Sequence, residues 1–135
     1  MPTRTFPGRY KSLAKIDDFI SPIIADLGFS SDQVYDIRLA LDEACTNIIE
    51  HGYGGEGKGD IRCSIENTEE GIKIILKDWG KKFDPDKIPK PDLNVDLEDL
   101  QMRGLGLYLM KNSMDKIGYC IDDGDGNTFV MTKRK

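Results

Sequence analysis

The chain has 135 residues, of which 39% are hydrophobic and 32% charged, and its formal net charge is -5. A chain of this length can bury about two thirds of its surface, and we expect residues 1–135 to form one domain. The acidic balance argues against nonspecific binding to nucleic acid, and the sequence carries neither a membrane-length apolar run nor the apolar core of a signal peptide.

A first amphipathic helix is predicted near the N-terminus. Apolar residues recur at spacings of three and four from Leu13 to Leu27, which predicts a helix over residues 11–27 that ends at Gly28. Pro22 lies inside this run and has no N–H to donate, so we expect it to kink or split the helix.

A second, stronger helix is predicted to follow. Residues 30–32 (Ser-Ser-Asp) offer N-caps, and the helix should continue to Gly52. Its apolar stripe consists of Val34, Ile37, Leu41, Ala44 and Ile48.

The periodicity then changes from that of a helix to that of strands. After a glycine cluster at 52–59, apolar residues alternate over 61–65 and again over 72–76, with a Glu-Glu-Gly turn at 69–71. This pattern predicts a β-hairpin.

The C-terminal half contains an irregular segment, a helix and two strands. Residues 79–102 carry three prolines and many charges without a period, which is typical of a functional lid or a disordered segment. Helical spacing returns over 104–114, and residues 119–121 and 128–132 are expected to form a closing strand pair. Because helices and strands fall in separate blocks, the predicted class is α+β, a mainly antiparallel sheet covered on one face by helices.

Three polar residues of the second predicted helix stand four apart. By helical geometry Glu43, Asn47 and His51 face away from the apolar stripe. The amide oxygen of Asn47 is a ligand type that Mg²⁺ accepts, and Glu43, one turn earlier, is near enough to act as a base. A solvated helix face explains the same spacing, and His51 can simply end the helix.

A carboxylate follows the second strand of the hairpin. Strand alternation puts Asp78 on the face of Ile72 and Leu76, where helices should cover it. A buried carboxylate needs a partner, which the exocyclic amine of a purine would provide, and Gly80 would let a flat ring approach the backbone. The alternative is an Asp that starts a turn at the end of a strand.

Two glycine motifs are candidates for ligand contacts. Arg103-Gly104-Leu105-Gly106 opens the predicted helix at 104–114, where backbone N–H groups and a fixed cation suit a phosphate. Gly126-Asn127-Thr128 enters the last strand, where a hydroxyl can bind a ligand or where the chain simply makes a tight turn.

The order and spacing of these motifs resemble the N, G1, G2 and G3 boxes of the GHKL ATPase superfamily, which includes histidine kinases, gyrase and MutL. A narrower resemblance is to the anti-sigma-factor serine/threonine kinases of the RsbW and SpoIIAB type. It lies in the sequences of residues 36–47 (DIRLALDEACTN), 51–53 (HGY) and 103–110 (RGLGLYLM). The resemblance covers residues 8–133.

This resemblance implies a Bergerat-type sandwich that binds ATP between helices and sheet, with residues 81–102 as the ATP lid. Glu43 would be the general base, and Arg103 would meet the terminal phosphate. The other implied contacts are Mg²⁺ at Asn47, adenine at Asp78, Gly80 and Thr128, phosphates at Gly104 and Gly106, and further nucleotide contacts at Phe83 and Leu105.

The resemblance further implies a cytoplasmic protein kinase that uses ATP and Mg²⁺. Members phosphorylate a serine on a STAS-domain antagonist and sequester a sigma factor as homodimers, with no nucleic acid or membrane as a direct partner. The three cysteines, at 45, 63 and 120, fit a reducing cytoplasm, because their number is odd and no Cys-x-x-Cys occurs. The sequence departs from the family pattern at two places, Trp79 and the spacing of Gly126-Asn127-Thr128. These departures bear on kinase turnover more than on nucleotide binding.

Two alternatives to the kinase remain open. One is a noncatalytic switch in which ATP only sets the choice of partner, although such a switch has no need of a base at Glu43. The other is the detached catalytic domain of a larger regulator or histidine kinase. His51 lies inside the helix of the N box, where it would not serve as a phosphoacceptor.

Overall fold

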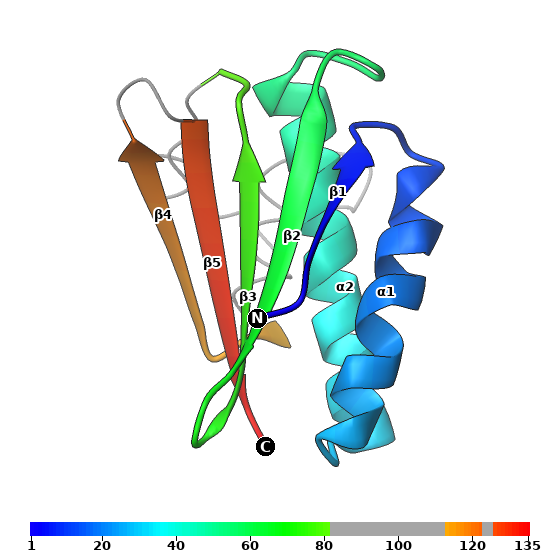
Figure 1. The fold of residues 1–135 in the computed structure, drawn as a ribbon, viewed down its shortest axis with the longest axis vertical. Helices are drawn as coiled ribbons and strands as arrows, with labels where there is room; N and C mark the ends of the chain where they lie inside the picture. The colour runs from blue at the N-terminus through cyan, green and yellow to red at the C-terminus, as the bar shows by residue number, and fades with distance from the viewer. Residues whose placement is uncertain (82–112, 123–125) are drawn as a thin grey trace, which may run out of the picture.

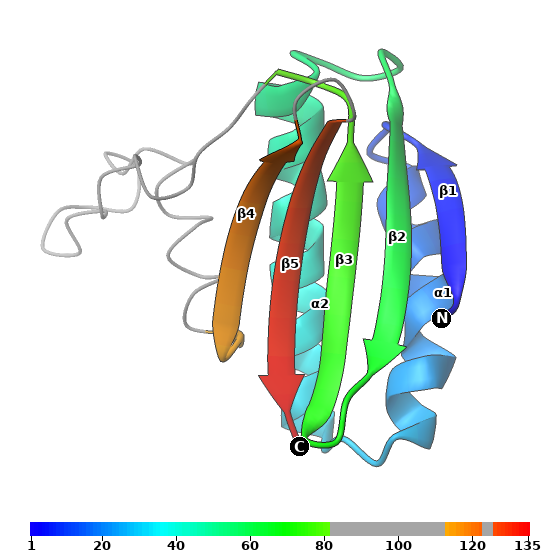
Figure 2. The ribbon, with the colours of Figure 1, turned by 60° about the vertical axis from the view of Figure 1, so that its left-hand side comes forward.

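The computed structural model describes residues 1–81, 113–122 and 126–135. These residues form a five-stranded antiparallel sheet in the order β1-β2-β3-β5-β4, with two long helices packed side by side on one of its faces (Figures 1 and 2). The predicted class, α+β with helices on one face of an antiparallel sheet, is therefore confirmed.

Helix α1 (Ser12–Asp26) agrees with the prediction in extent, but Pro22 does not split it. Pro22 is exposed, so solvent can satisfy the carbonyl that its missing N–H leaves unbonded. On the opposite side Ile16, Ile20 and Ile24 are buried and hold the helix against the core.

Helix α2 (Ser31–Asn47) begins with a capping box, in which Ser30 and Gln33 satisfy each other's backbone N–H. The chain continues as a π-helical turn, η1 (Ile48–Gly52), so the predicted helical path to Gly52 is correct but its last turn is wider than an α-helical turn. This turn brings Gly52 to the end of β3.

The predicted hairpin is formed by β2 (Asp60–Asn67) and β3 (Gly71–Asp78), in which Ile65 lies opposite Ile74. The closing pair, β4 (Lys116–Asp122) and β5 (Gly126–Arg134), is longer than predicted.

Strand β1 (Thr3–Pro7), which pairs with the outer edge of β2, has no counterpart in the sequence prediction. Of its five residues only Phe6 is buried, so an alternating pattern is not visible in so short a strand.

The core fills the space between the helices and the sheet. Its fully buried large side chains are Ile16, Ile20, Ile24, Ile37, Leu41, Ile49, Ile61, Ile65, Ile72, Ile74 and Leu76. None of the helices in the described part of the chain is both long and apolar enough to cross a membrane. The helix predicted over 104–114 falls almost wholly outside the described residues.

Candidate functional site: the end of strand β3

Asp78, the last residue of β3, lies on the helix-covered face of the sheet, as strand alternation predicts, and only 4% of its surface is exposed. Its Oδ1 accepts two hydrogen bonds, from the Gly80 backbone N–H at 2.9 Å and from the Asn127 side-chain amide at 3.1 Å. Burial raises the pKa of Asp78, and these two donors act in the opposite direction. Among the described residues none donates a hydrogen bond to Oδ2.

The backbone at Gly80 touches the backbone at the end of η1. A Cβ at Gly80 would lie 2.6 Å from the carbonyl carbon and oxygen of Gly52, a separation that side-chain atoms do not tolerate. The Gly52 carbonyl also accepts a hydrogen bond from the Lys81 N–H at 2.6 Å. Glycine at position 80 therefore allows the two segments to meet, and the motif Asp78-x-Gly80 has a structural reason for its glycine.

Asn47 ends α2, one π-helical turn before Gly52. The sequence places it off the apolar stripe of the helix, yet only 7% of its surface is exposed and its Nδ2 has no hydrogen-bond partner in the described structure. This burial does not fit the alternative of a solvated helix face at Asn47, because the neighbouring segments cover a wider arc of α2 than its apolar stripe. A buried amide atom without a partner is costly in free energy and suits a position that contacts a ligand.

Glu43 lies one turn before Asn47 and is half-buried. Burial is the main cause that raises the pKa of this carboxyl, and the negative charges of Asp42 and Glu50 raise it further. His51 belongs to the π-helical turn η1, so it does not follow Glu43 and Asn47 at the angle that a continuous α-helix would give. Its Nε2 is 4.0 Å from Glu50 Oε2.

Asn127, rather than Thr128, contacts Asp78. Its amide donates to the Asp78 carboxylate and also to the Gly80 carbonyl, at 3.1 Å each. Thr128 is the next residue of β5, lies opposite Lys77 and points to the helix-free face, so the structure does not bring it to the Asp78 carboxylate. The sequence held a signal for this assignment: alternation from the buried Phe129 places Asn127 on the helix-covered face.

Tyr53, directly after η1, connects three segments around the site. Its hydroxyl accepts a hydrogen bond from the Trp79 N–H at 2.9 Å and donates one to the Asp60 carbonyl at 2.6 Å. Its ring covers Gly59, where a Cβ would be 2.2 Å from a ring carbon. Sequence reasoning gave this residue no role.

The remaining predicted site residues, namely Phe83, Arg103, Gly104, Leu105 and Gly106, lie outside the described residues. The same holds for residues 82–102 of the predicted lid. In the described part of the chain, no group of three or more His, Cys, Asp or Glu side chains is arranged to hold a metal ion.

The geometry suits a purine nucleotide with its phosphates toward α2. A buried carboxylate with an oxygen that no described residue uses can accept an exocyclic amine. Asn47 offers an amide oxygen, a ligand that Mg²⁺ accepts together with waters and phosphate oxygens, and its unpartnered amide nitrogen fits a position that a ligand completes.

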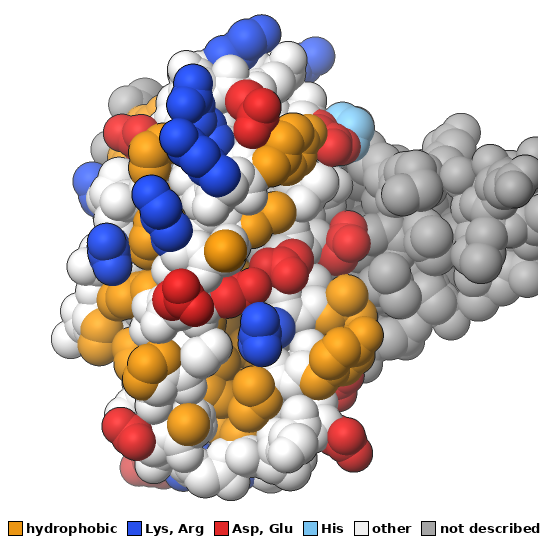
Figure 3. Space-filling view, turned by 90° about the vertical axis from the view of Figure 1, so that its right-hand side faces the viewer, with side chains coloured by type: hydrophobic (Ala, Val, Ile, Leu, Met, Phe, Trp, Pro, Cys, Tyr) orange, Lys and Arg blue, Asp and Glu red, His pale blue; other side chains and the backbone are white. Residues whose placement is uncertain are grey.

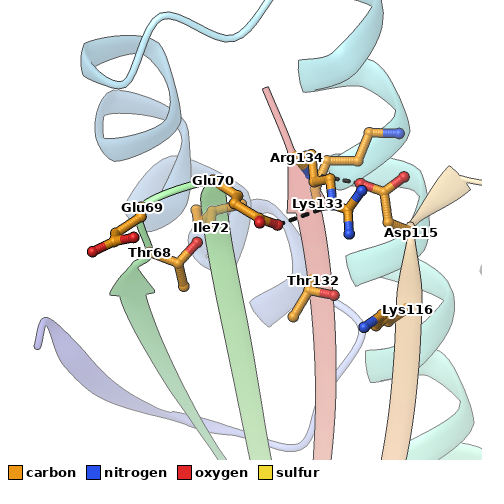
Figure 4. Close-up of a pocket in the computed structure, with 9 residues that line it drawn as sticks. All are labelled: Thr68, Glu69, Glu70, Ile72, Asp115, Lys116, Thr132, Lys133 and Arg134. Carbon is orange, nitrogen blue, oxygen red and sulfur yellow. Dashed lines mark hydrogen bonds and ion pairs between the residues drawn. The ribbon is translucent and has the colours of Figure 1, made fainter.

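A pocket lies at the opposite end of the sheet, between the β2–β3 turn, the start of β4 and the end of β5 (Figure 4). Several of its charged groups are paired within the chain. Arg134 lies 3.1 Å from Glu70, its N–H donates to Asp115 at 2.6 Å, and the Lys133 ammonium donates to the Ser113 carbonyl and lies 3.6 Å from Asp36. These contacts fasten the end of β5 to its neighbours, which gives the charges of this pocket a structural role.

Comparison with known proteins identifies a family whose domain matches nearly the whole chain. The model of the histidine kinase-like ATPase domain matches residues 6–133. The serine-protein kinase RsbW of Bacillus velezensis is 33% identical over 120 residues, which are 84% of this chain and 72% of that protein. The RsbW of Bacillus cereus strain B4264 is 34% identical over 131 residues, which are 94% and 80% of the two chains.

Among solved structures, the RsbU and RsbW domains of a Mycobacterium tuberculosis protein are similar to this chain with a TM-score of 0.66. The match covers 99% of this chain and 32% of that chain, at 17% sequence identity. At this identity the likeness supports a shared fold.

Proposed function

This chain belongs to the histidine kinase-like ATPase domain family, and we propose that it is an ATP-dependent serine-protein kinase of the anti-sigma-factor type. One structural observation carries most of the proposal. At the place where β3, η1 and β5 meet, Oδ2 of the buried carboxylate Asp78 receives no hydrogen bond from any described residue.

In this proposal Asp78 accepts the amine of adenine through Oδ2, while Asn127 and the Gly80 N–H fix the carboxylate through Oδ1. This arrangement favours ATP over GTP, because the exocyclic oxygen of guanine would face a carboxylate oxygen. Gly80 lies under the base, and Asn127 takes the place that the sequence gave to Thr128.

The chemical step is assigned to the α2 side of the site. Asn47 would be the protein ligand of Mg²⁺, and ATP supplies the phosphoryl group when it is bound. Glu43 takes the proton from the attacking serine hydroxyl, and its raised pKa makes it a better proton acceptor than an ordinary glutamate. Arg103, Gly104 and Gly106 would contact the phosphates, Phe83 and Leu105 would complete the nucleotide site, and residues 81–102 would cover it.

The proposed partners are proteins. The substrate is a serine on a STAS-domain antagonist, and the regulated target is a sigma factor that the protein sequesters by partner switching. We further propose that residues 1–135 form a single domain and that two copies of the chain associate as a homodimer. The proposed location is the cytoplasm.

The test is phosphoryl transfer to the proposed substrate. The protein is incubated with labelled ATP, Mg²⁺ and a STAS-domain protein encoded beside its gene, and each candidate serine of that protein is replaced by alanine in turn. Label on one serine, lost in a single replacement, is the expected result. If ATP binds and partner affinity depends on nucleotide while no label is transferred, the chain is a nucleotide-dependent binding switch.

A further inference from the structure

A basic pocket of about 620 Å³ opens between the start of α1 and the loop that joins η1 to β2. It is lined by Pro7, Arg9, Lys11, Lys15, Gly57, Lys58, Gly59 and Asp60, which include four cationic side chains and one carboxylate. Figure 3, which faces the α1 side of the molecule, shows Lys and Arg side chains gathered toward its upper end. Such a concentration of positive charge is unexpected in a chain with a net charge of -5.

Backbone contacts hold the two walls of this basic pocket together. The Gly8 N–H donates to the Gly59 carbonyl at 2.8 Å, and the Gly57 N–H donates to the Gly8 carbonyl at 3.0 Å. Glu56 adds a third link, because its carboxylate accepts a hydrogen bond from the Tyr10 N–H at 2.9 Å. The cationic side chains therefore stand on a fixed frame made of two segments distant in sequence.

The cations of the pocket have few partners of their own. Arg9, Lys11 and Lys15 are exposed, and their side chains make neither a hydrogen bond nor an ion pair with any residue that the structure describes. The Lys58 ammonium donates to the Gly54 carbonyl at 3.3 Å and to no other group in the described part of the chain. This differs from the pocket of Figure 4, where Lys133 and Arg134 are paired within the chain.

The same loop also borders the nucleotide site. It begins at Gly52, whose backbone meets Gly80, and Tyr53 links it to both Trp79 and Asp60. A molecule bound in the basic pocket would therefore contact a segment that is hydrogen-bonded to the end of β3.

We propose that the basic pocket docks an acidic segment of the protein partner, a stretch of polypeptide with several Asp or Glu side chains. The cations come from two separate segments and surround a wide opening, which suits a chain of carboxylates better than one small anion. Nucleic acid fits poorly, since backbone binding needs many phosphate contacts and the rest of the molecule repels it. The proposal rests on the proposed function only in taking the partner to be a protein.

The test uses the full chain and a fluorescent oligoglutamate peptide, with the matching oligoglutamine peptide as its neutral counterpart. Fluorescence anisotropy at low ionic strength should detect binding of oligoglutamate alone. The triple variant Arg9→Gln/Lys11→Gln/Lys15→Gln should bind it roughly 3- to 100-fold more weakly, since exposed ion pairs contribute little individually and are screened by salt.

A matched control removes the same charge elsewhere. Lys73, Lys116 and Lys135 lie outside the basic pocket, so Lys73→Gln/Lys116→Gln/Lys135→Gln lowers the net charge equally and should retain most of the binding. Equal losses in both triple variants would mean that only overall charge matters, which overturns the proposal. Tripolyphosphate that binds more tightly than the peptide and displaces it would overturn it in favour of a phosphate site.

Calorimetry with ATP on the same samples separates the two proposals. We expect the triple variant to bind ATP as the parent does, because none of its three residues contacts Asp78, Gly80 or Asn127. A parent that binds the peptide but no ATP would refute the proposed function and leave the docking site standing. A parent that binds ATP but not the peptide would refute the docking site and leave the proposed function standing.

Discussion

The side-chain amide of Asn127 donates to Oδ1 of Asp78 at 3.1 Å and so joins the start of β5 to the end of β3. Because the Gly80 N–H donates to the same oxygen, the carboxylate cannot rotate without losing two bonds. These two bonds therefore also fix the orientation of Oδ2, the atom that we propose accepts the amine of adenine.

The first prediction is that Asp78→Asn weakens ATP binding by about 1.5 to 3 kcal/mol, that is roughly 10- to 150-fold. In this variant an amide nitrogen can replace Oδ2, so that a donor faces the donor amine of adenine. Isothermal titration calorimetry with ATP and GTP measures the effect. Equal affinity of the parent for both nucleotides would refute the role of Asp78.

The second prediction compares neighbouring residues of β5. Asn127→Ala removes a bond that holds Asp78 and should cost about 0.5 to 1.5 kcal/mol of ATP affinity, whereas Thr128→Ala, on the helix-free face, should change it less than twofold. Losing this donor also lets the pKa of Asp78 rise further, so ATP binding of the Asn127→Ala variant should begin to weaken at a higher pH as the solution is acidified. If Thr128→Ala loses more ATP affinity than Asn127→Ala, the adenine contact belongs to Thr128, as the sequence predicted.

A third prediction concerns the contact between Gly80 and Gly52. Gly80→Ala puts a methyl group 2.6 Å from backbone atoms that cannot rotate away, so we expect a loss of about 1 to 3 kcal/mol in the free energy of unfolding and weaker ATP binding. Gly118→Ala in β4 is the matched control, because no atom lies within 4 Å of its Cβ position. Urea denaturation of both variants makes the comparison, and equal stability of the two would contradict this reading of Gly80.

The fourth prediction concerns pH and a buried carboxyl between the helices. Burial and the adjacent charge of Asp42 raise the pKa of Asp17 to about 7, although Arg38, 3.8 Å away, opposes the shift. A folded-state pKa above the unfolded value means that folding takes up a proton. The stability linked to Asp17 is therefore fully present below about pH 4 and is lost as the pH rises through 7.

Asp17→Asn should accordingly flatten the dependence of the free energy of unfolding on pH between about 4 and 7. The exposed neighbour Asp18 offers the control, since Asp18→Asn should leave the slope nearly unchanged. Urea denaturation at several pH values gives the slopes. If the free energy of unfolding depends on pH in both variants as it does in the parent, the assignment of this dependence to Asp17 is wrong.

The last prediction separates catalysis from binding. Glu43→Gln keeps the shape of the side chain but cannot accept a proton, so phosphorylation of the partner serine should fall by about 10²- to 10⁴-fold while ATP affinity stays within a few-fold. Because the pKa of Glu43 is raised, the parent rate should also decline on the acidic side at a higher pH than an ordinary glutamate would give. A Glu43→Asp variant, which keeps the charge and shortens the reach, measures the geometric part of the loss.

Elements with a long periodic pattern were predictable from the sequence. The apolar repeats fixed α1, α2 and the β2–β3 hairpin, and alternation along β3 correctly put Asp78 on the covered face. Strand β1 was missed because one buried residue makes no pattern, and the π-helical turn was missed because its extra residue leaves no periodic trace.

The candidate site was predictable where a motif coincides with a strand or helix of regular geometry. Asp78 and Gly80 meet this condition, and Thr128 does not, because the motif alone does not say which of two adjacent residues faces the ligand. The buried state of Asn47 depends on the segments packed around α2, which the spacing along the helix cannot reveal.

Trp79 gives the site a spectroscopic signal of its own. It is the one tryptophan of the sequence, it directly follows Asp78, and its half-exposed ring lies 5.2 Å from the Arg62 guanidinium and 6.0 Å from the Lys77 ammonium. Fluorescence excited selectively in tryptophan therefore comes from a single indole that lies near two cations, one residue after the proposed adenine contact. Nucleotide titrations can be followed in the unlabelled wild-type protein, without an attached dye that could disturb partner binding.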